Sequence, residues 1–495
     1  MRNGPQPDQD QGMVAPLEEP LSAAAKKTTL AALIMLAMFV ISGSVALYTG
    51  YLLWRGEAPE PVMRALPGDC DAVLYVDPKN LKELLVRARA IVPEMDARTA
   101  LLGLDGALGW HAGLAAYRGD AYGVCRRGPV WYAALGAQAM PNLEAEVTAW
   151  VDVLAAHTFA WRDFGGRKVA ASPGGLMPDR TAAAVRSDPQ LAQAVWLRSA
   201  GLPAGATADQ DAGRLLDQLQ GQREDQSLQA DKLFRDSLER TGGGQAHVFV
   251  RGDALRQWVS RHGAAVPLAL QPALDAVQWS ATAFRLDGNE LRVHDHVFGG
   301  QRLASWLKQH LDVAESIDFT SFAVSLPAHV AWGVVRAPVG GLATVAVLDP
   351  AVAELVGALP CEAPTTRRLW TEWLTGQFAW AQESRDQPRC FVGQLQPAHS
   401  QEMALPATLP PPQDGTVMRK LAHGYLIIGR PAALALCEQA LTSPGAKRSL
   451  SKDQQRLAEQ TQGWSNSGIT SGQTQFEWTW LDSGLVVEQT YRLYD

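Results

Sequence analysis

Segments from the two halves of the 495-residue chain resemble each other and occur in the same order. The segment that begins at Leu66-Pro67 (LPGDCDAVLYVDP) aligns with the one that begins at Leu326-Pro327 (LPAHVAWGVVRAP). Two further pairs follow at a nearly constant offset: GPVWYAALGAQ with QPRCFVGQLQP, and WRDFGGRKVAAS with MRKLAHGYLIIG. Similar segments repeated in one order indicate a duplicated structural unit. We therefore expect two related domains, at residues 62–312 and 313–495, with extra chain inserted in the first between residues 172 and 280.

Strand and helix patterns alternate within each repeat. Residues 72–76 (AVLYV) are a short apolar run that is typical of a buried strand, and Asp77-Pro78 after them predicts a helix start. Residues 142–157 and 431–441 are helical by their apolar period. Two antiparallel hairpins are expected, at WSATAFRLDGNELRVHDHVF and FEWTWLDSGLVVEQTYRLY. This pattern predicts an α+β fold, in which each domain has a mixed sheet with helices on one face.

An uncharged stretch runs from Thr28 to Trp54 and is longer than the ~20 residues that cross a bilayer. It predicts a transmembrane helix at residues 28–54, because a cleaved signal peptide has a shorter apolar region. Lys26 and Lys27 precede it, which favours a disordered cytoplasmic tail at residues 1–27. We therefore expect a single-pass signal anchor in the inner membrane, with the C-terminal bulk in the periplasm or outside the cell.

Ser42, Ala46 and Gly50 recur at every fourth position of this stretch. Small residues at that spacing let two helices approach closely in lipid. The pattern indicates a possible homodimer through the anchor.

Composition and motifs exclude several classes of function. The chain has 47% hydrophobic and 19% charged residues and a net charge of -7, which argues against a disordered chain and against general nucleic-acid binding. It contains no H-E-x-x-H, Walker A, G-x-G-x-x-G or G-x-S-x-G motif. His294 and His296 share a strand face, which we interpret as solvated rather than as a metal site because further ligands are not visible nearby. We expect no catalytic residues, no metal and no cofactor.

Five cysteines are present, without any C-x-x-C pair. An exported domain would be in an oxidising compartment, where disulfides persist. Cys361 and Cys390 are the predicted disulfide, because both belong to an insertion of the second repeat. Cys70 and Cys125 are a second candidate pair, which leaves Cys437 on an apolar helix and buried.

Three tryptophans are candidate binding residues: Trp370, Trp373 and Trp380. They lie in the insertion of the second repeat, close to the polar run at residues 382–389. One interpretation is an exposed groove for a glycan or a partner chain. The alternative is a local hydrophobic core.

Over most of residues 62–495 the chain also resembles an uncharacterised bacterial family of exported, single-anchor proteins. The resemblance is carried by an N-terminal anchor followed by the motif residues Leu66, Pro67, Asp69, Tyr75, Val76 and Leu81. The second repeat departs from this pattern, since His329 stands where the first has Asp69. The resemblance implies an architecture and no activity.

Together these features predict a membrane-anchored, non-enzymatic protein of the cell envelope. Its duplicated extracytoplasmic part is expected to bind an envelope protein or a cell-wall component. The alternative is an extracytoplasmic hydrolase or transferase whose active site matches no known motif.

Overall fold

The computed structural model places the chain in two compact units, residues 1–60 and 61–495. The described residues all belong to the second unit. They are 61–76, 121–136, 143–154, 158–164, 166–171, 180–187, 191–199, 208–261, 270–313, 316–346, 349–359, 370–384, 387–401, 415–421, 424–442, 448–460, 462–469, 472–481 and 483–493.

The described residues form eighteen strands of one continuous sheet. The strands of the first half are β1 (Ala72–Val76), β2 (Tyr122–Arg127), β3 (Val130–Gly136), β4 (Arg162–Phe164), β5 (Arg167–Ala171), β6 (Arg180–Ser187), β7 (Leu191–Ser199), β8 (Ala246–Arg251), β9 (Trp279–Asp287) and β10 (Glu290–Phe298). Those of the second half are β11 (Ala331–Arg336), β12 (Leu374–Gln382), β13 (Cys390–Leu395), β14 (Val417–Lys420), β15 (Tyr425–Gly429), β16 (Gly463–Ile469), β17 (Gly472–Leu481) and β18 (Gly484–Leu493).

Helices connect and cover these strands. They are α2 (Pro61–Arg64), α6 (Leu143–Leu154), α7 (Ala208–Gln220), α8 (Lys232–Thr241), α9 (Gly252–Arg261), α10 (Gln271–Ala276), α11 (Gly300–Leu311), α12 (Thr320–Ser325), α13 (Leu342–Val345), α14 (Pro350–Ala358), α16 (Pro431–Thr442) and α17 (Lys452–Gln460).

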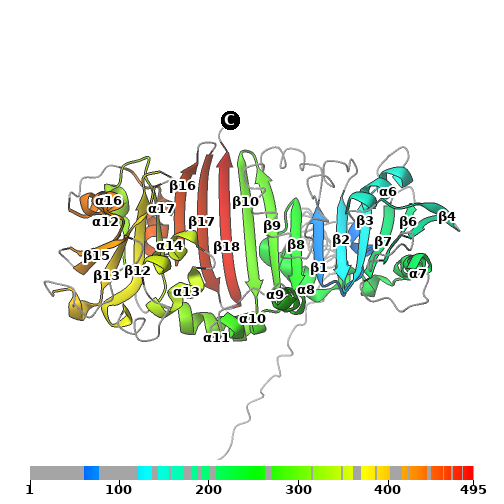
Figure 1. The fold of residues 1–495 in the computed structure, drawn as a ribbon, viewed down its shortest axis with the longest axis horizontal. Helices are drawn as coiled ribbons and strands as arrows, with labels where there is room; N and C mark the ends of the chain where they lie inside the picture. The colour runs from blue at the N-terminus through cyan, green and yellow to red at the C-terminus, as the bar shows by residue number, and fades with distance from the viewer. Residues whose placement is uncertain are drawn as a thin grey trace, which may run out of the picture. The chain divides into compact units, whose positions relative to one another are not determined.

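Strand pairing is antiparallel throughout the described sheet. From one edge to the other the strands follow the order β4-β5-β6-β7-β3-β2-β1-β8-β9-β10-β18-β17-β16-β11-β12-β13-β15-β14 (Figure 1). The two halves meet at β10 and β18, where Glu290 pairs with Arg492 and Phe298 with Gly484. We call this junction of β10 and β18 the seam.

The order of strands outward from the seam repeats in the two halves. In the second half it runs β18-β17-β16-β11-β12-β13-β15-β14, and in the first half it runs β10-β9-β8-β1-β2-β3, then β7-β6, then β5-β4. The hairpin of β6 and β7, followed by α7, is the extra element of the first half. It falls within the expected insertion between residues 172 and 280.

Helices pack on both faces of each half. In the first half, Leu74 of β1 lies in a core with Trp150 of α6, while Val73 lies in another core with Leu216 of α7 and Phe234 of α8. In the second half, one core includes residues of α11 and α14, and the opposite core includes residues of α12 and α16. All five residues of β1 are buried, because apolar side chains meet a helical layer on either side.

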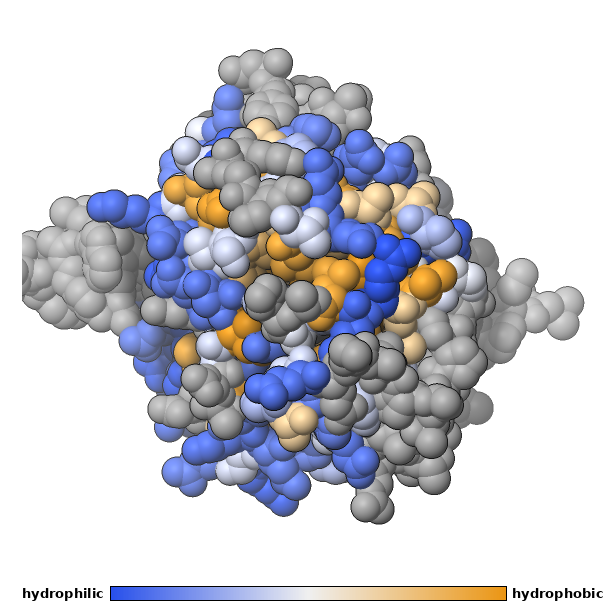
Figure 2. Space-filling model, turned by 90° about the vertical axis from the view of Figure 1, so that its left-hand side faces the viewer, coloured by the Kyte–Doolittle hydropathy of each residue, from blue (hydrophilic) through white to orange (hydrophobic). Residues whose placement is uncertain are grey.

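Figure 2 shows the end of the unit near β13 and β15, where apolar residues gather within a hydrophilic surround. Val417 of the edge strand β14 is among the exposed large apolar side chains, together with Phe164 of β4 and Leu481 at the β17 hairpin.

The predicted fold class is wrong in its architecture. The strands are not in mixed sheets, because both halves contribute antiparallel strands to the same sheet. Several local elements were predicted correctly. Strand 72–76, the two hairpins and the helices near 142–157 and 431–441 are present. The domain boundary at 312 and 313 stays a prediction.

The predicted membrane anchor is also contradicted. Among the described residues, no helix is long and apolar enough to cross a bilayer. Residues 28–54, with Ser42, Ala46 and Gly50, lie outside the described residues, as does the tail at 1–27. The inner-membrane location and the homodimer through the anchor were both predicted from that segment alone.

The disulfides differ from the first choice made from the sequence. Cys70 is bonded to Cys125, as the second candidate pair predicted. Cys390 of β13 is bonded to Cys437 of α16, so the predicted bond between Cys361 and Cys390 is wrong; Cys361 lies outside the described residues. The true partners are distant in sequence, and they meet because α16 packs on β13.

Substituting Cys437 with Ser should lower the free energy of unfolding by about 2–4 kcal/mol, because the unfolded chain loses a cross-link. Chemical denaturation under non-reducing conditions measures this change. Cys361→Ser is the matched control and should leave both disulfides intact in peptide maps of unreduced protein. A free Cys390 in the Cys361→Ser variant would contradict the assigned pairing.

His247 of β8 is fully buried beneath α8. Its ring meets Phe234 edge-on at 5.6 Å between centroids, and its Nε2 lies 3.0 Å from the Ser237 hydroxyl. Burial lowers the pKa of His247 to about 3, so the imidazole is neutral in the folded protein near neutral pH.

Acidification should therefore destabilise the protein as the pH falls from about 6.5 toward 3, because only the unfolded chain protonates this histidine readily. His247→Gln removes the titrating group. From about pH 7 to pH 5, the unfolding free energy of the wild type should fall by about 2 kcal/mol more than that of the His247→Gln variant. Denaturant titrations at the two pH values measure the difference. His329→Gln, at an exposed position, is the control, and its unfolding free energy should change with pH as that of the wild type does. The same pH dependence in His247→Gln as in the wild type would contradict the conclusion that buried His247 is neutral in the folded protein.

Candidate functional site

A cleft of about 630 Å³ lies beside the Leu66-Pro67 turn of the first half. One wall is formed by α7 and the residues after it, the other by the turn and the start of α8. The lining residues are Pro67, Gly68, Asp69, Arg127, Tyr132, Leu215, Gln218, Leu219, Gln222, Asp225, Gln226, Ser227, Ala230, Asp231 and Lys232.

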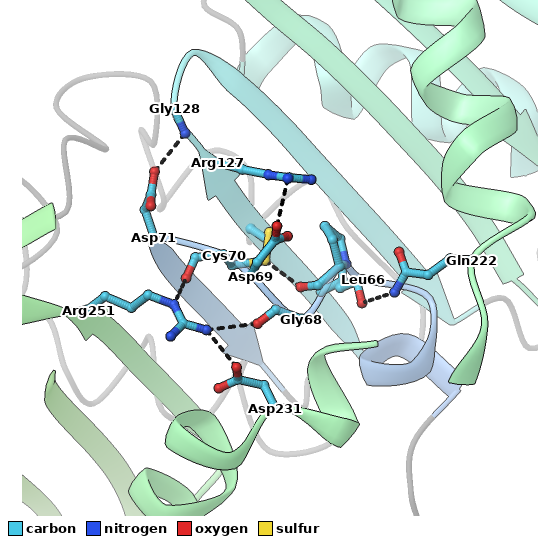
Figure 3. Close-up of a disulfide and its surroundings, with 12 residues drawn as sticks. Leu66, Gly68, Asp69, Cys70, Asp71, Arg127, Gly128, Gln222, Asp231 and Arg251 are labelled. Carbon is cyan, nitrogen blue, oxygen red and sulfur yellow. Dashed lines mark hydrogen bonds and ion pairs between the residues drawn. A yellow bond between two sulfur atoms is a disulfide. The ribbon is translucent and has the colours of Figure 1, made fainter. Parts of the chain in front are cut away.

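The turn at residues 66–70 is fixed through its backbone. Gly68 N–H donates to the Gln226 carbonyl at 2.8 Å, and Leu228 N–H donates to the Leu66 carbonyl at 2.8 Å. Pro67 and Ser227 therefore pair as a short antiparallel bridge. The disulfide between Cys70 and Cys125 ties the end of the turn to β2, and both sulfur-bearing residues are fully buried (Figure 3).

Arg251 holds this turn against the start of α8. Its guanidinium donates to the carbonyls of Cys70 at 2.8 Å and Gly68 at 2.9 Å, and to the Asp231 carboxylate at 2.6 Å (Figure 3). The other oxygen of Asp231 accepts from Phe234 N–H at 2.7 Å and so caps α8. One cation thus links β8, the turn and a helix start.

Charged groups line the mouth of the cleft. Arg127 and Asp69 form an ion pair at 2.7 Å, and both side chains are more than half exposed. Asp71 accepts from Gly128 N–H at 2.6 Å, which connects the turn to the β2–β3 hairpin. The ion pair is open to solvent, so its contribution to stability is small, and both groups are accessible to a ligand.

Tyr132 of β3 forms the floor and is buried, with 5% of its surface exposed. Burial raises the pKa of its hydroxyl; Arg127 opposes this change, while Asp69 adds to it. The phenol is therefore protonated at neutral pH and is not a nucleophilic phenolate.

Glutamines dominate the wall that begins with α7. Gln222 donates to the carbonyls of Leu66 at 3.2 Å and Gln226 at 2.7 Å, which locks the wall to the turn. Gln218, one helical turn earlier, is exposed and lines the cleft. Arg167 of β5 contacts Asp217 and anchors α7 on the sheet. The result is a pre-formed polar cleft with amide, carboxylate and guanidinium groups at its surface.

The second half holds its equivalent turn in a related way. Arg448 donates to the carbonyls of Pro327 and Val330, the latter at 2.7 Å. The Leu-Pro turn is thus fixed by a side-chain donor at its carbonyls in both halves, whereas the β6–β7 hairpin belongs to the first half.

The tryptophans predicted as binding residues are in the core of the second half. Trp370, Trp373 and Trp380 are 0%, 8% and 3% exposed and pack in the same apolar cluster. Trp373 stacks on His399 with ring centroids 4.0 Å apart, and the Arg389 guanidinium lies over Trp380. The exposed groove is therefore wrong, and the alternative of a local core is confirmed.

The residues that build the cleft were mostly missed from the sequence. Asp69, Asp71 and Arg251 are not among the candidate site residues that the sequence predicts. Their meeting with Gln222 and Asp231 depends on contacts between distant segments, which leave no local pattern. No group of three or more potential metal ligands occurs in the described part of the chain.

No protein-family model matches the chain. No curated protein matches it either. Among solved structures, crystal form I of TP0453 is 10% identical, covers 49% of this chain and 79% of its own, and has a TM-score of 0.27. Crystal form III of TP0453 is 11% identical, covers 53% of this chain and 91% of its own, and has a TM-score of 0.28. At these TM-scores the similarity carries no argument about fold or function.

Replacing Arg251 with Leu should lower the free energy of unfolding by about 2–3 kcal/mol, because it leaves two carbonyls and a largely buried carboxylate without their donor. Thermal and denaturant unfolding measure this loss. Arg251→Leu combined with Asp231→Asn removes the unpaired charge and should recover part of it. A single variant as stable as the wild type would show that this contact does not hold the turn.

Proposed function

We propose that the protein is a non-enzymatic binding protein that holds an extended polypeptide segment of a partner in the cleft of its first half. The observation that carries this proposal is the cleft itself, whose walls are fixed by a disulfide, a backbone bridge and the contacts of Arg251. A pre-formed site avoids the cost of ordering its own loops when a ligand binds.

The chemistry of the lining favours a peptide over a glycan. Exposed amides such as Gln218, together with the charges of Asp69 and Arg127, match the donors and acceptors of a polypeptide backbone and its polar side chains. Sugar recognition uses an exposed aromatic face, and Tyr132, the aromatic residue of the lining, is buried.

The lining also favours binding over hydrolysis. The Ser227 hydroxyl donates to the Glu224 carbonyl at 2.7 Å, the Asp231 carboxylate is engaged by Arg251, and Tyr132 keeps its proton. These groups are placed to hold a ligand rather than to attack one. The two disulfides are typical of proteins in oxidising compartments, so the partner is expected to be a protein of the same compartment.

Blocking the cleft tests this proposal. Gln218→Trp places a bulky side chain at the mouth without changing a buried residue, and Gln257→Trp on α9 is a matched exposed control. Full-length wild-type protein should select a shared sequence pattern from a library of linear displayed peptides. Gln218→Trp should bind the selected peptides at least about tenfold more weakly, and Gln257→Trp should bind them as the wild type does.

The same proteins are also tested on an array of cell-wall oligosaccharides. If no peptide is selected, and the wild type binds a glycan selectively while Gln218→Trp does not, the ligand of the cleft is a glycan and the peptide proposal is wrong. Peptide binding that is unchanged in Gln218→Trp would contradict the cleft as the site.

A further inference from the structure

A second cavity, of about 160 Å³, lies at the seam between the two halves. Its floor is formed by neighbouring strands β9, β10 and β18, and the C-terminal end of α8 borders it. The polar side chains that line it are those of Thr241, Arg285, Arg292, His294, Glu488 and Thr490. Ala283 pairs with His294 across the β9–β10 ladder, and its small side chain leaves the space open.

Two arginines supply most of the charge of this cavity. Arg285 donates to the Gly242 carbonyl, and Arg292 donates to Glu290 at 3.0 Å. Glu290 also accepts from Arg492 at 2.9 Å, and these hydrogen bonds lower its pKa and keep it ionised. Each guanidinium has five N–H groups. Within the described residues, therefore, Arg285 and Arg292 both retain N–H groups that can serve a ligand.

The acid of the lining, Glu488, is hydrogen-bonded to a histidine. His294 Nδ1 lies 3.0 Å from the Glu488 carboxylate, and this hydrogen bond lowers the pKa of Glu488. His294 and Glu488 are directly opposite each other in the β10–β18 ladder. Two guanidinium groups, those of Arg285 and Arg292, face this one carboxylate among the lining residues, so the lining has a net positive charge.

The equivalent positions of the second half show that the fold does not need these arginines. The β9–β10 hairpin aligns with the β17–β18 hairpin residue for residue. In the first, β9 ends at Asp287 and β10 begins at Glu290; in the second, β17 ends at Leu481 and β18 begins at Gly484. Arg285 therefore corresponds to Thr479, and Arg292 to Val486. A sheet of the same connectivity forms with a hydroxyl and an apolar side chain at these positions.

We infer that the seam cavity is a binding site for a phosphate group, held by Arg285 and Arg292 with a hydrogen bond from Thr490. Guanidinium groups match phosphate oxygens with paired, charge-assisted hydrogen bonds. The donors come from β9, β10 and β18, and the two guanidinium groups together offer enough N–H groups to reach more than two oxygens, which suits a tetrahedral oxyanion better than a planar carboxylate. The volume admits inorganic phosphate or a small phosphate ester.

Calorimetric titration of the full-length protein with inorganic phosphate tests the inference. The wild type should bind saturably, and its thermal midpoint should rise with phosphate concentration. The double variant R285Q/R292Q should bind at least about tenfold more weakly. Arg419→Gln is the matched control, because Arg419 is exposed on β14 and pairs with Glu438, and it should bind phosphate as the wild type does.

Circular dichroism and the thermal midpoint without phosphate show whether each variant is folded. Glycerol 3-phosphate distinguishes the source of the group: tighter binding than inorganic phosphate assigns a phosphate ester, and weaker binding assigns the free ion. Absence of saturable binding by the wild type, or equal affinity in the double variant, would overturn the site. Equal affinity for acetate would overturn the assignment to phosphate.

Discussion

Backbone pairing between β10 and β18 is the contact on which the architecture depends. Each of these strands ends one half of the unit, and nine residue pairs join them in antiparallel register. Without this ladder each half would present a long unpaired strand, with its N–H and C=O groups available for pairing with other chains. With it, the edges of the described sheet are β4 and β14, which have three and four residues. Pairing at the seam thus protects the longest strands.

The two halves share one connectivity but differ in the elements around the Leu-Pro turn. In the first half, the β6–β7 hairpin and α7 extend the unit beside the Leu-Pro turn, and the cleft forms between α7 and that turn. In the second half, the turn is fixed by Arg448, and the disulfide instead joins β13 to α16. The inserted hairpin adds two strands to the sheet between β3 and β5, and the other strand pairs of the first half match those of the second. A duplicated sheet can therefore gain a cleft in one copy while the strand pairing common to both copies is kept.

Local sequence patterns predicted single elements and failed on long-range pairing. The apolar run at 72–76 and the two-residue turns of the late hairpins depend on neighbouring residues, and these elements formed as expected. The partner of Cys390 is determined by the packing of α16, and the partners of Arg251 by the meeting of three segments, so neither leaves a local pattern. Trp370, Trp373 and Trp380 look like binding residues when read alone, but the helical layer on that face buries them. The antiparallel pairing across the seam could not be predicted from the sequence either. Strands and helices alternate along each half, and the same alternation is found in proteins with mixed sheets.

The most direct test of the account is hydrogen exchange of the backbone amides of β10 and β18, measured residue by residue in the full-length protein. If the two halves form one continuous sheet, the amides that hydrogen-bond across the seam should exchange as slowly as those between the interior strands β1 and β8, and far more slowly than those of the edge strand β14 that face away from β15. Rapid exchange along β10 and β18, like that of unpaired edge amides, would contradict the single sheet and show that the two halves are separate domains.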